Sequence, residues 1–142
     1  MSIFRFIGNN GHFILFFLSI FLLRDKTIYM FYYIVGSFIN YIINSVLKRI
    51  IQQPRNDSEI IDRENDSRTS KTFGMPSWHA QSAFFSTVFI YFALKKRNIL
   101  YFYVFISAIT MIQRVVYKRH TILQVIVGAF IGSFIGYLYF DI

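Results

Sequence analysis

Long apolar stretches, broken by short clusters of charge, constrain this sequence more than any other feature. Apolar residues dominate segments 13–23, 27–47, 77–94, 99–117 and 122–140. A helix needs about 20 mostly apolar residues to cross the hydrocarbon core of a bilayer. The five segments therefore predict an all-α fold, a polytopic membrane helical bundle with about five transmembrane helices. At 142 residues the chain is expected to form a single membrane-embedded domain, 1–142.

The N-terminal apolar segment is the exception in length. Residues 13–23 are short for a full span, and a run of this length is typical of an interfacial or re-entrant helix. The charged residues Arg24-Asp25-Lys26 follow it instead of a small-residue cleavage site, so we expect it to be retained and not removed as a signal peptide. His12 lies beside no basic cluster and is expected to sit at the interface without a functional role.

Composition limits the partners and the kinds of site. The chain is 55% hydrophobic with a formal net charge of +8, and much of that charge lies at the ends of apolar segments. This placement favours phosphate headgroups or an anionic lipid over nucleic acid. The lack of cysteine excludes disulfides and thiolate metal sites. The polar loop at 56–73 carries acidic residues without metal-ligand spacing, so we expect no metal and no cofactor.

Three polar clusters interrupt the apolar segments, at residues 48–55, 74–81 and 113–124. Because consecutive spans cross the bilayer in alternate directions, these clusters are expected on one membrane face. The residues predicted to meet there are Lys48, Arg55, Ser77, His79, Arg114 and His120. The other face receives basic residues for which simple anchoring of helix ends is an equally good explanation, namely Arg24, Lys26, Lys95, Lys96 and Arg97.

Such a convergence suits phosphoryl transfer without a metal. Arginine side chains bind phosphate oxygens in bidentate fashion, and a helix that begins after Pro76-Ser77 offers free backbone N–H groups to an anion. One histidine can attack phosphorus while the other gives or takes a proton. The cationic groups then stabilise the charge that spreads over the phosphoryl oxygens. We therefore expect an enzyme, a metal-independent hydrolase.

The spacing of the clusters resembles that of the type-2 phosphatidic acid phosphatase superfamily. Lys48 and Arg55 keep that family's gap of six residues, with Asn56 in place of its proline. The run 76–79, Pro-Ser-Trp-His, is similar to its Pro-Ser-Gly-His motif. Arg114 and His120 keep the five-residue gap of its third motif, in which Gln113 and Gln124 stand at the family's Ser and Asp. The resemblance covers a motif-bearing core at 48–140.

Within that superfamily the dolichyl-diphosphatase branch is the most similar, because its motifs also carry Gly-Met-Pro-Ser and a Gln at position 124. The resemblance implies hydrolysis of a polyprenyl diphosphate to the monophosphate through a phosphohistidine, at a lumenal site in the endoplasmic reticulum membrane. It implies that His120 is the nucleophile, that His79 is the acid and then the base, and that Gln124 orients His120. The phosphate-binding residues that it implies are Lys48, Arg55, Ser77, Trp78 and Arg114.

Other functions fit some of the same residues. The lipid can instead be phosphatidate or another lipid phosphate or diphosphate. Trp78, Asn56 and a short N-terminus also fit a catalytically degenerate copy that binds lipid or a membrane partner. Vanadium haloperoxidases share the phosphate-binding residues, but they are soluble proteins, and the apolar segments count against that function.

The last apolar segment carries a stripe of small residues. Gly128, Gly132 and Gly136 are four residues apart, so they form one smooth helical face for close packing. That face can pack within the chain or against another copy, so a homo-oligomer is a possible assembly. By the positive-inside rule, Arg24, Lys26 and the run 95–97 lie on the cytoplasmic side, which makes the predicted active face lumenal.

Overall fold

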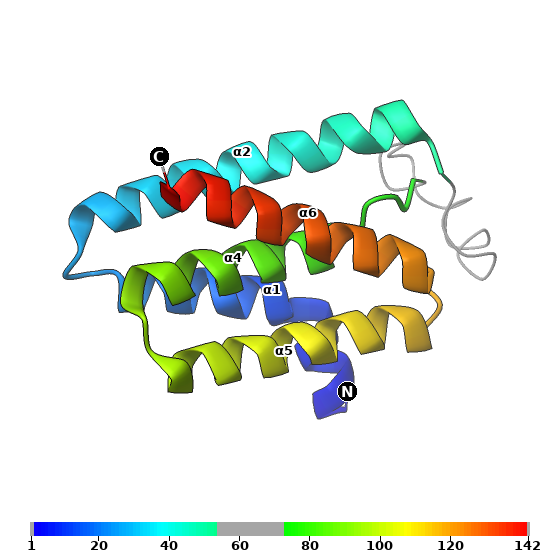
Figure 1. Cartoon of the computed structure of the whole chain (residues 1–142). Coiled ribbons are helices and arrows are strands. Elements are labelled where there is room, and N and C mark those ends of the chain that lie inside the picture. Colours follow the sequence, from blue (N-terminus) through cyan, green and yellow to red (C-terminus); the bar gives the residue numbers. More distant parts are fainter. Residues whose placement is uncertain (1, 54–72, 142) are drawn as a thin grey trace.

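Five helices make up the part of the chain that the computed structural model describes, residues 2–53 and 73–141 (Figure 1). The helices are α1 (Ile3–Leu22), α2 (Thr27–Ile51), α4 (Trp78–Leu94), α5 (Arg97–Val116) and α6 (Ile122–Asp141). Consecutive helices run in alternate directions along one bundle. The prediction of an all-helical bundle is confirmed for these residues. The predicted loop, together with Arg55 and Asn56, lies almost wholly outside them.

Helix α4 lies at the centre of the bundle. It packs against each of the other four helices and most closely against α6 (Figure 1). Buried side chains occur on all sides of α4, which is typical of a helix enclosed by others. The outer helices α1, α2, α5 and α6 are each long and apolar enough to cross a membrane, whereas α4 has 17 residues. Every described side chain of the central helix is buried or half-buried.

Helix α1 corrects the expectation of a short N-terminal segment. It begins at Ile3, ten residues before the apolar run, and its 20 residues are enough to span. The Oγ of Ser2 caps it by accepting a hydrogen bond from Arg5 N–H at 3.2 Å. Two polar residues of its first half, Asn9 and His12, face α5 and α4 inside the bundle. The helix is therefore longer than the apolar run alone predicted, and it is long and apolar enough to span.

The glycine stripe of α6 packs against α4 within the same chain. A Cβ atom on Gly128 would lie 2.5 Å from the carbonyl oxygen of Ser77, and one on Gly136 would lie 3.0 Å from that of Phe85. On Gly132 it would clash with the backbone of Gln81. The two helix backbones are therefore in direct contact, as small residues permit. This face is buried, so it is not the surface through which a homo-oligomer would form.

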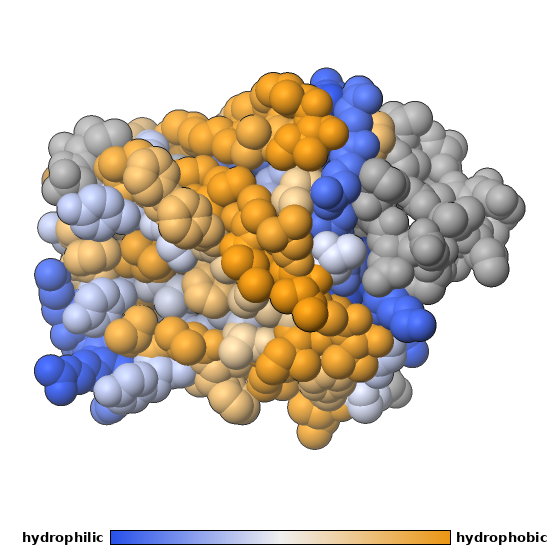
Figure 2. Space-filling model, turned by 45° about the vertical axis from the view of Figure 1, so that its right-hand side comes forward, coloured by the Kyte–Doolittle hydropathy of each residue, from blue (hydrophilic) through white to orange (hydrophobic). Residues whose placement is uncertain are grey.

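The outside of the bundle is a belt of large apolar side chains. Figure 2 shows hydrophobic residues over the middle of the molecule, with hydrophilic residues toward its two ends. Phe17 on α1, Phe31 on α2, Phe105 on α5 and Phe130 on α6 are all more than half exposed. Soluble proteins rarely leave so continuous an apolar surface in contact with water. The arrangement is that of a multi-pass membrane protein.

Polar side chains inside the belt pair with one another across helices. Tyr33 Oη lies 2.6 Å from Ser86 Oγ, which joins α2 to α4. Ser19 Oγ lies 2.8 Å from Tyr103 Oη, which joins α1 to α5. Such pairs hold helices together where neither water nor lipid can satisfy a hydroxyl group.

Candidate active site

The predicted polar clusters lie at one end of the bundle. The C-terminal ends of α2 and α5 and the N-terminal ends of α1, α4 and α6 all reach the right-hand side of Figure 1. Lys48, Ser77, Arg114 and His120 are each at most 9% exposed there. Burial of two basic side chains is unusual unless they are paired with other groups. Arg55, which was predicted to meet them, falls outside the described residues.

His120 and Gln124 form the best-defined contact of the site. Gln124 Oε1 lies 3.2 Å from His120 Nδ1 and also accepts the backbone N–H of Thr121 at 3.1 Å. The Gln124 amide nitrogen donates to Gln53 Oε1 at 2.7 Å. Because the Thr121 N–H can only donate, the oxygen of the Gln124 amide must face the ring, and Nδ1 must carry the hydrogen. In the neutral ring of His120, the nitrogen without a hydrogen is then Nε2.

Arg114 is held next to His120 by the backbone between α5 and α6. The carbonyl oxygen of Arg114 accepts N–H groups from Arg119 at 2.8 Å and from His120 at 3.1 Å. Its guanidinium Nη1 donates to Asn9 Oδ1 at 3.4 Å, and Gln113 Nε2 donates to the same oxygen at 3.0 Å. A tight turn thus brings Arg114 to the nucleophile candidate, and α1 holds it from the other side.

Ser77 is the N-cap of α4 and is fully buried. Its Oγ accepts the backbone N–H of Ala80 at 3.4 Å, and its own N–H donates to the carbonyl oxygen of Gln124 at 3.2 Å. The hydroxyl hydrogen of Ser77 remains chemically able to donate to an anion. The backbone bond to Gln124 places the start of α4 directly against the start of α6.

Helix α2 closes the site through amide side chains. Asn44 Nδ2 donates to the Pro76 carbonyl oxygen at 3.2 Å and to Gln81 Oε1 at 2.8 Å. Lys48 lies one helical turn further along α2, so it shares the face of Asn44 that looks toward the start of α4. The C-cap residue of α2, Gln52, is left-handed at φ 53°, and the chain then turns so that Gln53 reaches Gln124.

His12 corrects a prediction made from the sequence. It is only 4% exposed, and its ring centroid lies 4.2 Å from that of His79, with the rings edge to face. Within the described residues, its Nδ1 has no hydrogen-bond partner. His12 is therefore buried at the site instead of lying at the interface. Asn9 and His12 are three residues apart on one helix face, and this spacing was the signal that the sequence analysis missed.

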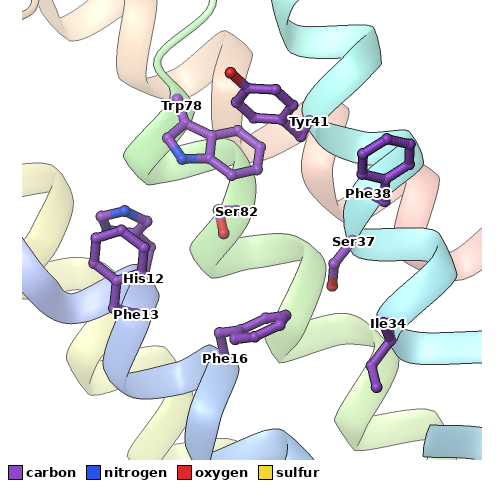
Figure 3. A pocket seen from close by; sticks show the side chains of 9 residues that line it. All are labelled: His12, Phe13, Phe16, Ile34, Ser37, Phe38, Tyr41, Trp78 and Ser82. Atoms are coloured by element: carbon purple, nitrogen blue, oxygen red, sulfur yellow. The ribbon is translucent and has the colours of Figure 1, made fainter. Parts of the chain in front are cut away.

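Trp78 faces away from the polar contacts just described. Its ring packs edge to face on Tyr41 of α2 at 5.4 Å between centroids and approaches His12 at 6.4 Å. Both Trp78 and His12 line an apolar hollow of about 330 Å³ between α1, α2 and α4 (Figure 3). The residue that takes the family's glycine position thus forms a wall between the polar end of α4 and this hollow.

Known proteins resemble this chain over most of its length. The family model of the PAP2 superfamily matches residues 26–142. The chain is 37% identical over 117 residues to a dolichyldiphosphatase of Saccharomyces cerevisiae. This match covers 75% of this chain and 48% of that protein. It is 35% identical over 115 residues to lipid phosphate phosphatase epsilon 2, chloroplastic, of Arabidopsis thaliana. That match covers 75% of this chain and 37% of the plant protein.

The chain spans about half the length of the first relative and little more than a third of the second. No solved structure matches it. Helix α1, which supplies Asn9 and His12, lies outside the family match. The predicted family is confirmed by a match that covers most of the chain and by both relatives. This chain belongs to the PAP2 superfamily.

Proposed function

We propose that this chain is an integral membrane lipid phosphatase that hydrolyses a polyprenyl diphosphate to the monophosphate and inorganic phosphate. The proposal rests on membership of the PAP2 superfamily and on similarity to a protein named dolichyldiphosphatase. The observation that carries it is the contact of Gln124 Oε1 with His120 Nδ1 at 3.2 Å. This contact directs the unprotonated Nε2 of a buried histidine toward chemistry as a nucleophile.

The first step forms a phosphohistidine. His120 Nε2 attacks the terminal phosphorus while the bond from phosphorus to the bridging oxygen breaks. His79 gives its proton to that oxygen, and the lipid monophosphate leaves. Gln124 Oε1 accepts a hydrogen bond from His120 Nδ1–H in both steps, so the ring keeps its orientation when it becomes positively charged. This role needs an acceptor and not a negative charge, which explains how a glutamine can stand at the family's aspartate.

The second step returns the enzyme to its starting state. His79, now neutral, takes a proton from a water molecule as the water oxygen attacks phosphorus. The phosphorus–nitrogen bond breaks, its electron pair returns to His120 Nε2, and inorganic phosphate leaves. Arg114, Lys48 and the N-terminal N–H groups of α4 at Ser77 stabilise the charge on the phosphoryl oxygens in both steps. Arg55 is proposed for the same role from its motif spacing alone, and the site is proposed to work without a metal or cofactor.

The nucleophile can be tested directly on purified protein in lipid nanodiscs. Wild type should release phosphate from a polyprenyl diphosphate and, when quenched with alkali after exposure to a terminally ³²P-labelled substrate, should carry label on a histidine. His120→Ala should abolish both signals, with a loss of rate of about 10⁴-fold or more. Equal turnover by His120→Ala would exclude this nucleophile. A wild type that binds substrate without turnover would identify a catalytically degenerate protein.

The lipid is a separate question. Similarity to a protein named lipid phosphate phosphatase favours, as a second candidate, phosphatidate or another lipid monophosphate. A panel of polyprenyl diphosphate, polyprenyl monophosphate and phosphatidate, each presented in the same nanodiscs, separates the two candidates by the ratio of kcat/KM. We expect the diphosphate to be preferred because its leaving group is a phosphate and needs less protonation than an alkoxide.

We further propose that the chain acts as one membrane domain with its active end in the lumen of the endoplasmic reticulum. The chain contains no native cysteine, so single introduced thiols report on topology. Ser58→Cys, in the predicted polar loop, should react with a membrane-impermeant maleimide only after sealed microsomes are opened. Asn98→Cys, at the start of α5 and at the opposite end of the bundle, should react in sealed microsomes. The reverse pattern would place the active end in the cytoplasm.

A further inference from the structure

An apolar hollow opens beside the candidate active site. It lies between α1, α2 and α4, has a volume of about 330 Å³ and contains the side chains shown in Figure 3. Its residues are His12, Phe13, Phe16, Ile34, Ser37, Phe38, Tyr41, Trp78 and Ser82. Most of this surface is aromatic or aliphatic, and Ser37 and Ser82 place hydroxyl groups between the rings (Figure 3). Ligand pockets for small molecules begin at about this volume.

One end of the hollow lies next to His79, the proposed general acid, with the His12 ring between them. His12 and Trp78 belong to its wall, and the His12 ring lies 4.2 Å from that of His79. A molecule in the hollow would therefore be separated from the proposed general acid by one ring. The Trp78–Tyr41 contact, with centroids at 5.4 Å, forms the other side of this end.

The hollow also opens toward the lipid side of the bundle. Phe38 of α2 is 65% exposed and Phe13 of α1 is 54% exposed, and both lie on the hollow. Helices α1 and α2 make few contacts with each other, whereas α1 packs mainly against α5 and α4 and α2 packs mainly against α4. In a bilayer these exposed rings lie among acyl chains, so an apolar chain could enter sideways without crossing water.

We propose that this hollow binds the part of the lipid chain nearest to the phosphate. The occupant is the isoprenoid chain of the substrate, so the inference rests on the function proposed above and names the site that selects its chain. The volume suits a few isoprene units, and the rest of the chain remains in the bilayer. Aromatic rings give a branched, unsaturated chain a close-packed contact. Trp78 and His12 lie where the chain meets the diphosphate.

A second apolar hollow provides the comparison. It has a volume of about 260 Å³ between α5 and α6 and is lined by Met111, Ile112, Val115, Val116, Ile122, Val125 and Ile126. Its lining residues include no histidine and no hydroxyl-bearing residue. It is similarly apolar and similarly exposed to lipid, so it is a matched control for any effect of filling a surface hollow.

The first test compares long and short substrates in nanodiscs. Ser37→Trp fills the first hollow, and kcat/KM is measured for a long polyprenyl diphosphate and for dimethylallyl diphosphate, which has the same reacting group and one isoprene unit. The ratio of long to short should fall at least about tenfold relative to wild type. Ile126→Trp, which fills the second hollow, should leave the ratio unchanged. An unchanged ratio in Ser37→Trp, or a fall of the same size in Ile126→Trp, would overturn the proposal.

The second test needs no turnover and no variant. A polyprenyl phosphonate with a diazirine on its second isoprene unit is bound to wild type in nanodiscs and photolysed, and the adducts are mapped by mass spectrometry. Adducts should concentrate on peptides that contain Phe13 and Phe38. Adducts on α5 and α6, or spread evenly over all lipid-facing helices, would overturn the proposed site. If wild type hydrolyses no diphosphate, the proposed function fails, and this experiment still decides whether the hollow binds the chain.

Discussion

The two ends of the bundle both carry basic side chains, but they hold them in different ways. At the active end, Lys48 and Arg114 are buried, and the Arg114 guanidinium bonds to Asn9 on another helix. At the opposite end, Arg24 lies 4.1 Å from the centroid of the Phe21 ring and donates to the Phe21 carbonyl oxygen at 2.9 Å. Lys95 lies 5.1 Å from the centroid of Phe92, also on its own helix.

The difference shows that a cluster of basic residues does not by itself identify a functional site in a membrane protein. The exposed residues Arg24 and Lys95 extend toward the headgroups and touch their own helices, which costs little. Lys26, also exposed, makes one hydrogen bond to another helix, from Nζ to the Ala93 carbonyl oxygen at 3.3 Å. Buried ones are tolerated only when groups from several helices surround them. The residues of the active end come from all five helices and are connected through side chains such as Asn9, Gln53 and Gln124.

The largest difference between the two ends is expected in the kcat values of matched arginine variants. Arg114→Ala should lower kcat on a lipid diphosphate by about 10²–10³-fold, because a donor to the transition-state oxygens is lost. Arg97→Ala, at the start of α5 and at the opposite end, should change kcat by no more than about twofold. Initial rates of phosphate release give both values, and circular dichroism checks the fold. Similar losses in the two variants would mean that the ends do not differ in function.

Variants of Gln124 separate the effect of orienting His120 from the effect of placing a charge beside it. Gln124→Leu removes the acceptor for His120 Nδ1–H and should lower kcat about 10–100-fold, as loss of an orienting partner does. Gln124→Glu keeps an acceptor of the same reach and should retain most activity. Its carboxylate favours the imidazolium form of His120, so the acid limb of the pH–rate profile should move to higher pH. If Gln124→Leu is as active as wild type, the orienting role is wrong.

His12 tests whether α1 belongs to the active end. His12→Phe keeps a ring against His79 but removes its nitrogen atoms, and we expect kcat to fall about tenfold with a change in the pH–rate profile. Asn10→Ala is the control, since Asn10 Nδ2 donates to the Phe6 carbonyl oxygen of its own helix at 3.1 Å. A merely structural role for His12 would lower the yield or the Tm without moving the pH–rate profile.

The smallest effect is expected at the opposite end. Arg24→Gln removes one hydrogen bond to the Phe21 carbonyl and one cation–π contact, both at the surface. The Tm of the protein in detergent should fall by no more than a few degrees, with kcat unchanged. A large loss of stability would show that exposed charges at this end hold the bundle together, contrary to the comparison.

The sequence by itself determined the helices, their alternation and the end of the bundle that carries the motifs. These follow from local physics, since an apolar run of spanning length must be helical in lipid, and each crossing reverses direction. The motif spacing around Lys48, His79, Arg114 and His120 also identified the family before any fold was known. The role of Gln124 was predicted from the resemblance, and its contact with His120 is the geometry that this role requires.

Only the tertiary structure decided which helix faces meet. His12 and Asn9 looked like interruptions of an apolar segment until α1 was seen to begin at Ile3 and to turn both residues inward. From the sequence alone, the glycine stripe could equally have faced a second copy of the chain. The packed helices show that it contacts the α4 backbone. Helical periodicity states which residues share a face, but the neighbour of that face depends on contacts between segments distant in the chain, and the lipid hollow arises only from them.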